Sequence, residues 1–365
     1  MEKVKKVRSI SAMCLAAVMA FMAVTLTSPV QVAAQEFFGG MPPLIVYRTT
    51  ANLRLRTEPS TQSSIITTVP RGTQVQVLSF RDGEWFAVNV NGLEGYMYSG
   101  FLTFVSVRAY GSPMYIAGSV TIMDVKTGQV FYESDQHTLR YPASITKIMT
   151  ALLVLERTND LSDEVTFSRT AVSIPSYASR MGMRAGDTLT VYDALYGLLL
   201  TSGNEVANAL AEHVSGSIEE FVELMNQRAT FLGATNTRFL NPSGLPGPGQ
   251  HTTSFDMALI MREAIRHPVF NRIIATPSTY IASTGSNPNS RTIRNLNRLI
   301  QNGPDFNEWV VGGKTGFTGA ARHTIVTYSQ NDGRSLIVSL LYVPQRSTIF
   351  SETTALLEFA FSKLY

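Results

Sequence analysis

Between residues 51 and 97, apolar and polar residues alternate in short runs. Such runs are typical of half-buried β-strands, and the turn signals Asp82-Gly83 and Asn91-Gly92 separate some of them. The predicted strands span 51–56, 65–69, 74–78, 85–88 and 94–97. Short strands that follow one another this closely indicate a small all-β barrel.

After residue 113 the pattern is that of a mixed domain. A predicted hairpin at 119–132 comes first, and a β section that opens at 312–316 continues through strands at 324–328 and 335–343. In between, apolar residues recur every three or four positions, which predicts helices. The predicted helices span 145–156, 191–200, 205–214, 218–232, 254–267 and 348–363. Strands at both ends with helices between them predict one α+β unit, whose sheet joins its first and last strands.

The net charge of +3 is concentrated at the N-terminus. Residues 1–34 hold four basic residues and one acidic residue, so the remainder is close to neutral, and no basic patch indicates nucleic-acid binding. An apolar run from Ile10 to Leu26 and the small residues before Gln35 predict a secretory signal peptide cleaved after Ala34. An uncleaved anchor helix is the alternative interpretation.

The single cysteine, Cys14, lies inside this apolar run, so the mature chain would hold no disulfide and no thiol chemistry. No later apolar stretch is long enough to span a membrane. Residues 35–43 and 106–113 are interpreted as linkers. The sequence therefore predicts a two-module protein that is exported to the cell envelope or secreted.

The stretch from Tyr141 to Leu155 runs from a loop into a helix, and it places Ser144 and Lys147 on one side of the first turn. A serine hydroxyl becomes an effective nucleophile when a base removes its proton. A lysine amine can be that base only if it is neutral, which an apolar environment or a second cation favours by lowering its pKa. In the alternative interpretation, Ser144 caps the helix and the Lys147 side chain extends to water.

Two further polar elements accompany this pair. Ser202 and Asn204 lie in a loop between two predicted helices. Lys314-Thr315-Gly316 follows two glycines at the start of a predicted strand, where glycine would let a ligand backbone lie close. The same tripeptide at Lys126-Thr127-Gly128 lies in a hairpin turn and is interpreted as a polar turn only. The order S-x-x-K, S-x-N, K-T-G is the motif set of penicillin-binding proteins and class A β-lactamases.

Residues 114–365 resemble the serine D-alanyl-D-alanine carboxypeptidases, which are low-molecular-weight penicillin-binding proteins. Beyond the three motifs, the resemblance rests on the segments PASITKIMTALLVLE, MRAGDTLTVYDALYGLLLTSGNEVANALAEH, FVELMNQRATFLGATNTRFLNPSGL and GGKTGFTGAARHTIV. It implies a β-lactamase/DD-peptidase-like transpeptidase domain of the α+β class, with a central antiparallel sheet, flanking helices and a helical subdomain. It also implies peptidoglycan stem peptides as substrates, β-lactam antibiotics as covalent inhibitors, and no cofactor.

The resemblance implies the catalytic roles. Ser144 would attack the carbonyl between two D-alanines and form an acyl-enzyme, and Lys147 would take its proton. Ser202 would relay a proton to the departing amine. Asn204 would hold the substrate amide.

The strand motif would supply the substrate-binding residues Lys314, Thr315, Gly316 and Phe317. Lys314 would provide a positive charge for the terminal carboxylate and would help to keep Lys147 neutral. Thr315 would donate a hydrogen bond to the same carboxylate. By analogy with the family, the amides of Ser144 and Phe317 would stabilise the oxyanion.

The sequence departs from the family pattern at several points. Glu205 follows Asn204 where aspartate is common, and Arg322 stands where glycine is frequent. The chain ends at Tyr365, so we expect no C-terminal membrane anchor of the kind that longer members carry. Members without that anchor include enzymes that cut cross-links, so a DD-endopeptidase is the alternative function.

Two other functions are less expected. A β-lactamase would need a deacylating glutamate, and none stands in the corresponding context. A non-catalytic wall-binding protein is disfavoured because all motif residues are intact. The five histidines show no metal-ligand spacing, so no metal is expected.

Residues 44–105 resemble the bacterial SH3-like family. The resemblance rests on NLRLRTEPS, PRGTQVQVL, GEWFAVNVNGLEGY and the closing Ser99-Gly100-Phe101-Leu102. Such modules bind cell-wall peptide or act as spacers. Trp85 is predicted to lie in the barrel core, whereas Tyr96 and Tyr98 could form either core or a binding surface.

Overall fold

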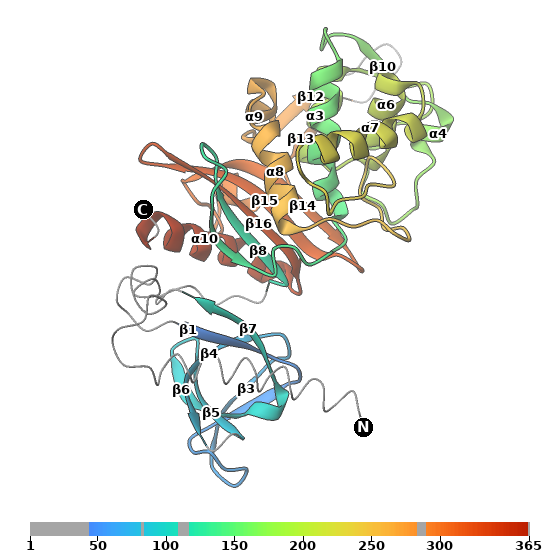
Figure 1. The fold of residues 1–365 in the computed structure, drawn as a ribbon. Coiled ribbons are helices and arrows are strands. Elements are labelled where there is room, and N and C mark those ends of the chain that lie inside the picture. Colours follow the sequence, from blue (N-terminus) through green and yellow to red (C-terminus); the bar gives the residue numbers. More distant parts are fainter. Residues whose placement is uncertain (1–43, 82–83, 109–116, 283–289, 364–365) are drawn as a thin grey trace. The chain divides into compact units, whose positions relative to one another are not determined.

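The computed structural model describes residues 44–81, 84–108, 117–282 and 290–363 (Figure 1). The chain separates into two compact units, residues 1–116 and 117–365. The predicted signal peptide at 1–34, the linker at 35–43 and most of the linker at 106–113 lie outside the described residues. Within the described ranges, no helix is long and apolar enough to cross a membrane.

The N-terminal unit is a seven-stranded sheet with the strand order β3-β2-β6-β5-β4-β1-β7. Its strands are β1 (Leu44–Thr49), β2 (Leu53–Arg56), β3 (Ile65–Val69), β4 (Gln74–Arg81), β5 (Trp85–Val90), β6 (Leu93–Tyr98) and β7 (Leu102–Arg108), with the short 3-10 turn η1 (Ser99–Phe101) before β7. All five predicted strands are present. The structure adds β1 and β7, which pair with each other, and β7 takes up the first residues of the linker expected at 106–113.

The core of this unit is formed by alternate residues of the strands, as the period of two requires. Leu55, Val75, Val88 and Met97 are fully buried. Phe86 is buried too, which turns Trp85 to the other face of β5 and leaves it half-buried. The prediction that Trp85 belongs to the core is therefore wrong.

An aromatic row lies on the outer face of the same strands. The Trp85 and Tyr98 rings meet edge to face with centroids 5.7 Å apart, and Phe101 lies 6.2 Å from Tyr98. Since Met97 points into the core, Tyr96 and Tyr98 face outward on β6. The structure excludes the core alternative for these two tyrosines, and their role in binding stays a prediction.

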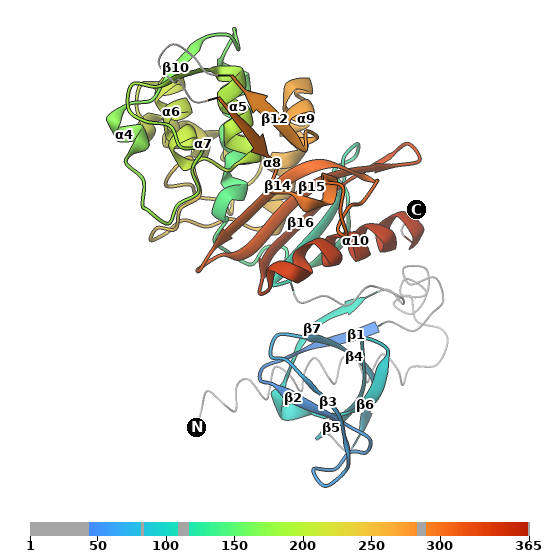
Figure 2. The same cartoon turned by 180° about the vertical axis from the view of Figure 1, so that it is seen from behind.

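The large unit is built on a five-stranded antiparallel sheet with the strand order β14-β15-β16-β8-β9. Its strands are β8 (Ser119–Asp124), β9 (Val130–Ser134), β14 (Val310–Thr318), β15 (Arg322–Asn331) and β16 (Arg334–Val343). Strand β16 pairs with β8, so the sheet joins the first and last strands of the unit, as predicted. Helix α8 (Ser254–Ala264) covers one face of the sheet, and α10 (Arg346–Lys363) covers the other (Figures 1 and 2).

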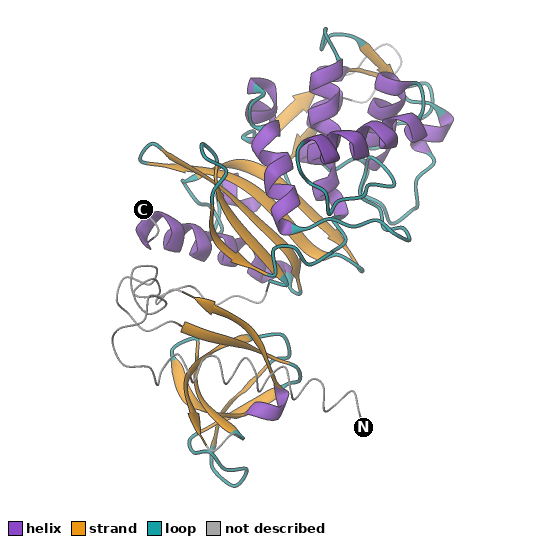
Figure 3. Ribbon diagram, viewed as in Figure 1, coloured by secondary structure: helices purple, strands orange, loops and turns teal. Residues whose placement is uncertain are grey.

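The remaining helices gather at the β14 end of the sheet, where Figure 3 shows them as one purple cluster. They are α3 (Lys147–Arg157), α4 (Arg169–Val172), α5 (Val191–Leu200), α6 (Asn204–Ser215), α7 (Ile218–Phe231) and α9 (Pro268–Ile274). Two small antiparallel pairs accompany them, β10 (Glu164–Thr166) with β11 (Thr188–Thr190), and β12 (Ser278–Ile281) with β13 (Arg291–Arg294). The predicted α+β class, with a sheet, flanking helices and a helical subdomain, is confirmed.

Helix α3 lies at the centre of this cluster. The apolar spacing predicted one buried face, but all residues from Lys147 to Val154 are buried. A helix that is buried on every side must be surrounded by other elements, and α3 contacts α5, α6, α7 and α8. The site residues that precede and begin α3 are thus attached to a helix that is buried along most of its length.

The predicted helix at 254–267 is in fact interrupted. Helix α8 ends at Ala264, and Pro268 begins the separate helix α9. The residue before a proline is disfavoured in the helical conformation, and His267 is extended with φ −86° and ψ 116°. Helix α9 matters for the site because it packs against β14.

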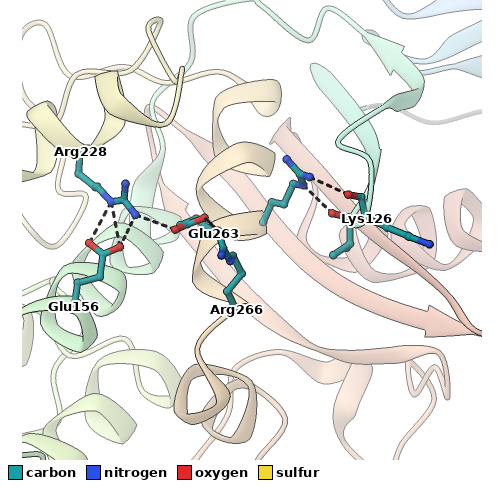
Figure 4. Close-up of polar contacts among 7 residues, drawn as sticks. Lys126, Glu156, Arg228, Glu263 and Arg266 are labelled. Carbon is teal, nitrogen blue, oxygen red and sulfur yellow. Dashed lines mark hydrogen bonds and ion pairs between the residues drawn. The ribbon is translucent and has the colours of Figure 1, made fainter.

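An ion-pair network joins the C-terminal parts of three helices (Figure 4). Arg228 of α7 pairs with Glu156 of α3 at 2.5 Å and with Glu263 of α8 at 2.9 Å. Arg266, which follows α8, also pairs with Glu263, at 3.1 Å. The side chains of Arg228, Glu156 and Glu263 are only 17%, 21% and 23% exposed, whereas that of Arg266 is 74% exposed.

We expect Arg228→Ala to lower the free energy of unfolding by about 1–3 kcal/mol, because it leaves the largely buried Glu156 carboxylate without a counter-charge and leaves Glu263 with only the exposed Arg266. Thermal unfolding should then shift down by roughly 2–8 °C. Arg266→Ala is the matched control and should change the free energy by less than about 0.5 kcal/mol. Equal effects of the two substitutions would show that the network does not stabilise the helical cluster.

Candidate active site

Three segments that are far apart in the sequence carry the predicted site residues. Ser144 lies in the 3-10 turn η2 (Ala143–Thr146), which leads directly into α3 and Lys147. Ser202 lies in the loop between α5 and α6, and Asn204 is the first residue of α6. Lys314-Thr315-Gly316 lies within β14.

These segments meet at one cleft of about 780 Å³. Ser144, Ser202 and Asn204 line it together with Thr315, Gly316 and Phe317 of β14. Lys147 and Lys314 are 0% and 1% exposed and lie behind the lining. The cleft is also lined by three groups of residues that the sequence analysis did not single out, namely residues 177–179, residues 243–246 and Arg346 of α10.

The Lys147 amine has three polar neighbours. Its Nζ lies 3.1 Å from the Ser144 Oγ, 2.7 Å from the Asn204 Oδ1 and 2.7 Å from the carbonyl oxygen of Ser243. The last two can only accept hydrogen bonds, whereas the serine hydroxyl can donate as well. A neutral amine has two N–H bonds and one lone pair, so donating to the two acceptors leaves its lone pair for the Ser144 hydroxyl.

The environment of Lys147 favours that neutral form. Burial lowers the pKa of its amine well below the usual value, and the positive charge of Lys314 lowers it further. Glu205 acts in the opposite direction with a smaller effect on this pKa. The alternative in which Lys147 extends to water and Ser144 caps the helix is wrong, because the amine is buried and Ser144 makes no capping hydrogen bond.

Lys314 is buried almost as completely as Lys147. Its Nζ donates a hydrogen bond to the carbonyl oxygen of Thr315 at 2.9 Å, and burial lowers its pKa to about 7. The positive charge that the resemblance assigns to Lys314 therefore depends on pH. Near neutral pH the Lys314 amine is partly charged, and a bound carboxylate would favour its protonation.

Ser202 points a free hydroxyl toward the cleft. Its backbone is left-handed, with φ 62°, which is uncommon for a residue other than glycine. The residue is 2% exposed, and its Oγ has no hydrogen-bond partner among the described residues. A buried, unpaired hydroxyl in a cleft is available to a ligand.

The glycines of β14 serve close packing within the protein. A Cβ on Gly316 would lie 2.7 Å from the Ser144 amide nitrogen and 2.5 Å from the Thr324 Oγ1. A Cβ on Gly312 would lie 2.5 Å from the carbonyl oxygen of Ile274 in α9. Gly316 and Gly312 thus have a structural role, since they let η2 and α9 approach the strand, and the expectation that the two glycines before Lys314 let a ligand backbone lie close stays a prediction.

A loop after α7 completes the site, and sequence reasoning did not identify it. The Asn241 Oδ1 accepts hydrogen bonds from the amides of Gly244 at 2.7 Å and Leu245 at 3.1 Å. This turn fixes the Ser243 carbonyl that binds Lys147. The Asn-Pro-Ser-Gly sequence signals a turn, but nothing in it points to a contact with a residue 96 positions earlier.

The sheet side of the cleft carries two further features. The Phe317 side chain is 58% exposed and stacks on the His323 ring with centroids 4.4 Å apart. Arg322 adopts φ 56°, a left-handed conformation that glycine adopts without strain. Over the described ranges, no group of three or more His, Cys, Asp or Glu side chains could hold a metal ion.

A serine hydroxyl beside a buried amine, at the junction of an antiparallel sheet and a helical cluster, defines the penicillin-binding class of serine peptidase folds. The chain belongs to the D-alanyl-D-alanine carboxypeptidase family, peptidase S11, whose sequence model matches residues 107–344. A bacterial SH3 domain model matches residues 51–103. Both resemblances drawn from the motifs are confirmed.

Individual relatives agree with this assignment. The D-alanyl-D-alanine carboxypeptidase DacF of Bacillus subtilis is 33% identical over 251 residues, which cover 68% of this chain and 62% of DacF. DacB2 of Mycobacterium tuberculosis, also a D-alanyl-D-alanine carboxypeptidase, is 37% identical over 227 residues, or 60% of this chain and 73% of DacB2. The match thus spans less than two thirds of the length of DacF.

A solved structure shows the same fold. The crystal structure of a D-alanyl-D-alanine carboxypeptidase from Mycobacterium tuberculosis H37Rv has a TM-score of 0.63 to this chain at 34% sequence identity. The matched region covers 69% of this chain and 95% of that chain. The similarity therefore involves the large unit as a whole.

We expect Gly316→Ala to destabilise the large unit by about 1–3 kcal/mol, because the new methyl group would overlap the Ser144 amide and the Thr324 hydroxyl. Gly319→Ala is the matched control, since Gly319 also lines the cleft but a Cβ added there would meet no atom within 4 Å. Thermal unfolding of both variants measures the difference. If Gly316→Ala unfolds at the wild-type temperature, the strand does not pack against η2 as described.

Proposed function

We propose that the protein is a serine-type D-alanyl-D-alanine carboxypeptidase that removes the terminal D-alanine of peptidoglycan stem peptides through an acyl-enzyme. The observation that carries the proposal is the buried Lys147 amine 3.1 Å from the Ser144 hydroxyl. Burial lowers the pKa of this amine and so favours its neutral, basic form, and the amine lies within reach of the proton it must remove.

In the proposed reaction the Ser144 Oγ forms a bond to the carbonyl carbon between the two D-alanines, and its proton passes to Lys147. The tetrahedral intermediate then breaks its C–N bond. The departing amine takes the proton that Lys147 has received, and the Ser202 hydroxyl can relay it because it has no protein partner in the described part of the chain. Water hydrolyses the resulting ester, which releases the shortened peptide and restores the Ser144 hydroxyl.

The amides of Ser144 and Phe317 are proposed to stabilise the oxyanion, as the family resemblance implies. Asn204 is proposed to have two functions. Its Oδ1 orients the Lys147 amine, and its amide group borders the cleft, where it can hold the substrate backbone.

The terminal carboxylate of the substrate is proposed to bind at Lys314 and Thr315. Arg346 lines the same cleft and adds a second cation. The carboxylate would draw a proton onto Lys314, whose pKa of about 7 lies close to neutral pH. The protonated Lys314 would in turn favour the neutral form of Lys147, so substrate binding would activate the base.

The proposed organisation follows the modules. Residues 1–34 direct export, residues 44–105 form an SH3-like module that binds cell-wall peptide or acts as a spacer, and residues 114–365 form the catalytic domain. The linkers at 35–43 and 106–113 join them. The protein would act in the cell envelope, where its substrate is found.

Labelling with a fluorescent penicillin tests the nucleophile. The wild type should form a covalent adduct, whereas Ser144→Ala and Lys147→Met should label at least about a thousandfold more slowly. Ser176→Ala and Lys126→Met, which change exposed residues outside the site, are the controls. An unlabelled wild type, or a labelled Ser144→Ala variant, would refute the proposal.

Product analysis separates the possible reactions. Release of D-alanine from a pentapeptide is the expected result, and cleavage of cross-linked dimers at a comparable rate would identify a DD-endopeptidase instead. Fast hydrolysis of penicillin would identify a β-lactamase. Binding to cell walls without any covalent labelling would identify a non-catalytic wall-binding protein.

The pH dependence of kcat/KM tests the two lysines. Activity should fall at acid pH as Lys147 becomes protonated, and it should fall above about pH 7 as Lys314 loses the charge that binds the carboxylate. Lys314→Met should remove the alkaline limb. It should also move the acid limb to higher pH, because loss of the Lys314 charge raises the pKa of Lys147. An acid limb that stays in place would exclude coupling between the two amines, and Lys126→Met is the control.

A further inference from the structure

A buried carboxylate beside the site has no role in the reaction described above. Glu205 is the second residue of α6 and is 2% exposed. Its Oε1 accepts hydrogen bonds from the amides of Met181 at 2.6 Å, Gly182 at 2.7 Å and Met183 at 3.4 Å. One carboxylate oxygen thus holds three consecutive backbone amides.

The turn at 181–183 is shaped for this contact. Gly182 has φ 94°, a conformation that lets neighbouring amides converge on one anion. On the other side of the turn, the Arg291 Nη1 of β13 donates to the carbonyl oxygen of Met181 at 2.7 Å. The turn is therefore held between a carboxylate and a guanidinium, both anchored on regular secondary structure.

The turn is continuous with the lining of the cleft. The cleft is lined just before this turn by Tyr177, Ala178 and Ser179. The backbone N–H of Asn204 donates a hydrogen bond to the carbonyl oxygen of Ser179 at 2.9 Å. Asn204 and Glu205 therefore hold the same segment at two points, while the Asn204 side chain binds the Lys147 amine. The position of the 177–179 segment is tied to the position of the base.

We propose that Glu205 is a positioning residue for acylation, whose carboxylate fixes the turn at 181–183 and through it the cleft lining at 177–179 relative to Ser144 and Lys147. This inference rests on the proposed function.

The Glu205 carboxylate also has an electrostatic effect on the Lys147 amine. The charged groups that act on the Lys147 amine are Lys314 of β14 and Glu205 of α6, whereas its contacts from η2 and the 241–245 loop are uncharged.

The length of the side chain matters for the contact. Aspartate is one methylene shorter than glutamate and would draw the acceptor oxygen away from the three amides. Glutamine keeps an oxygen at the same reach but removes the charge. Because the Glu205 Oε2 has no hydrogen-bond partner among the described residues, the amide group of glutamine would replace an atom that binds nothing there.

The test uses the variants Glu205→Asp, Glu205→Ala and Glu205→Gln. Glu212→Gln is the matched control on the same helix, because the Glu212 carboxylate accepts a hydrogen bond from the Ser168 hydroxyl outside the cleft. Hydrogen exchange at the amides of 181–183 reports the turn without relying on activity. Kinetics with a pentapeptide and labelling with fluorescent penicillin report the site. Thermal unfolding verifies that each variant is folded at the assay temperature.

In Glu205→Asp and Glu205→Ala, exchange at 181–183 should become at least about tenfold faster. Their kcat/KM should fall about ten- to a hundredfold, because a shift of the cleft lining by about 1 Å is enough to misalign the reacting groups. Glu205→Gln should keep slow exchange and a KM near that of the wild type. Its acid limb should move to lower pH, because loss of the carboxylate charge lowers the pKa of Lys147.

Three results would overturn the inference: unchanged exchange at 181–183 in Glu205→Asp and Glu205→Ala, a loosened turn with kcat/KM equal to that of Glu212→Gln, or a Glu205→Gln variant whose acid limb stays at the wild-type pH. The last result would reduce Glu205 to a purely structural residue. Failure of the proposed function is recognised separately, because it leaves the wild type unlabelled, while the exchange experiment still tests the clamp on the turn.

Discussion

The burial of one amine organises the large unit. Removing a lysine side chain from water is unfavourable unless its amine is neutral and its hydrogen bonds are satisfied. At Lys147 the partners come from the turn before α3, the start of α6 and the loop after α7. The hydrogen bonds of the buried amine are therefore satisfied only when all three segments are in place.

A second buried lysine, Lys314, and the carboxylate of Glu205 have opposite effects on the pKa of Lys147. Lys147 and Lys314 cannot easily both carry a proton, and the carboxylate of Glu205 offsets part of their mutual repulsion. In the proposed reaction, the substrate carboxylate would add a negative charge next to Lys314. The proton would then settle on Lys314 and leave Lys147 as the base, so the desolvation that destabilises the free site would also prepare it for the substrate. This explains why the acidic residue of α6 binds backbone amides, since a direct ion pair with Lys147 would hold the base in its charged form.

Local patterns were sufficient to predict the elements that carry the site. The apolar spacing predicted α5, α6 and α7 within one residue at almost every end, and the strands at both ends of the domain predicted the pairing of β16 with β8. The three motifs identified Ser144, Ser202, Asn204 and residues 315–316 of the cleft lining, but not residues 177–179, residues 243–246 or Arg346. What could not be predicted depends on contacts between distant segments, such as the Ser243 carbonyl at Lys147 and the Glu205 clamp on the turn. The size of Trp85 favours a place in the core, although the alternation along β5 gives that place to Phe86.

Two residues of the site that are not glycine adopt a positive φ where the segments of the site meet. Ala143 and Ser202 both have left-handed backbones, with φ 52° and 62°; Ala143 precedes Ser144, which lines the cleft, and Ser202 lines the cleft itself. Such conformations are unfavourable for residues with a Cβ and persist only when the surroundings enforce them. At Ala143 the surroundings are Gly244, where any side chain would overlap the Ala143 carbonyl, and Gly316, which lies against the Ser144 amide. Glycines on two packed segments thus permit a strained turn on a third, and that turn directs the Ser144 hydroxyl toward the lysine instead of toward the helix amides that an ordinary capping serine would bind.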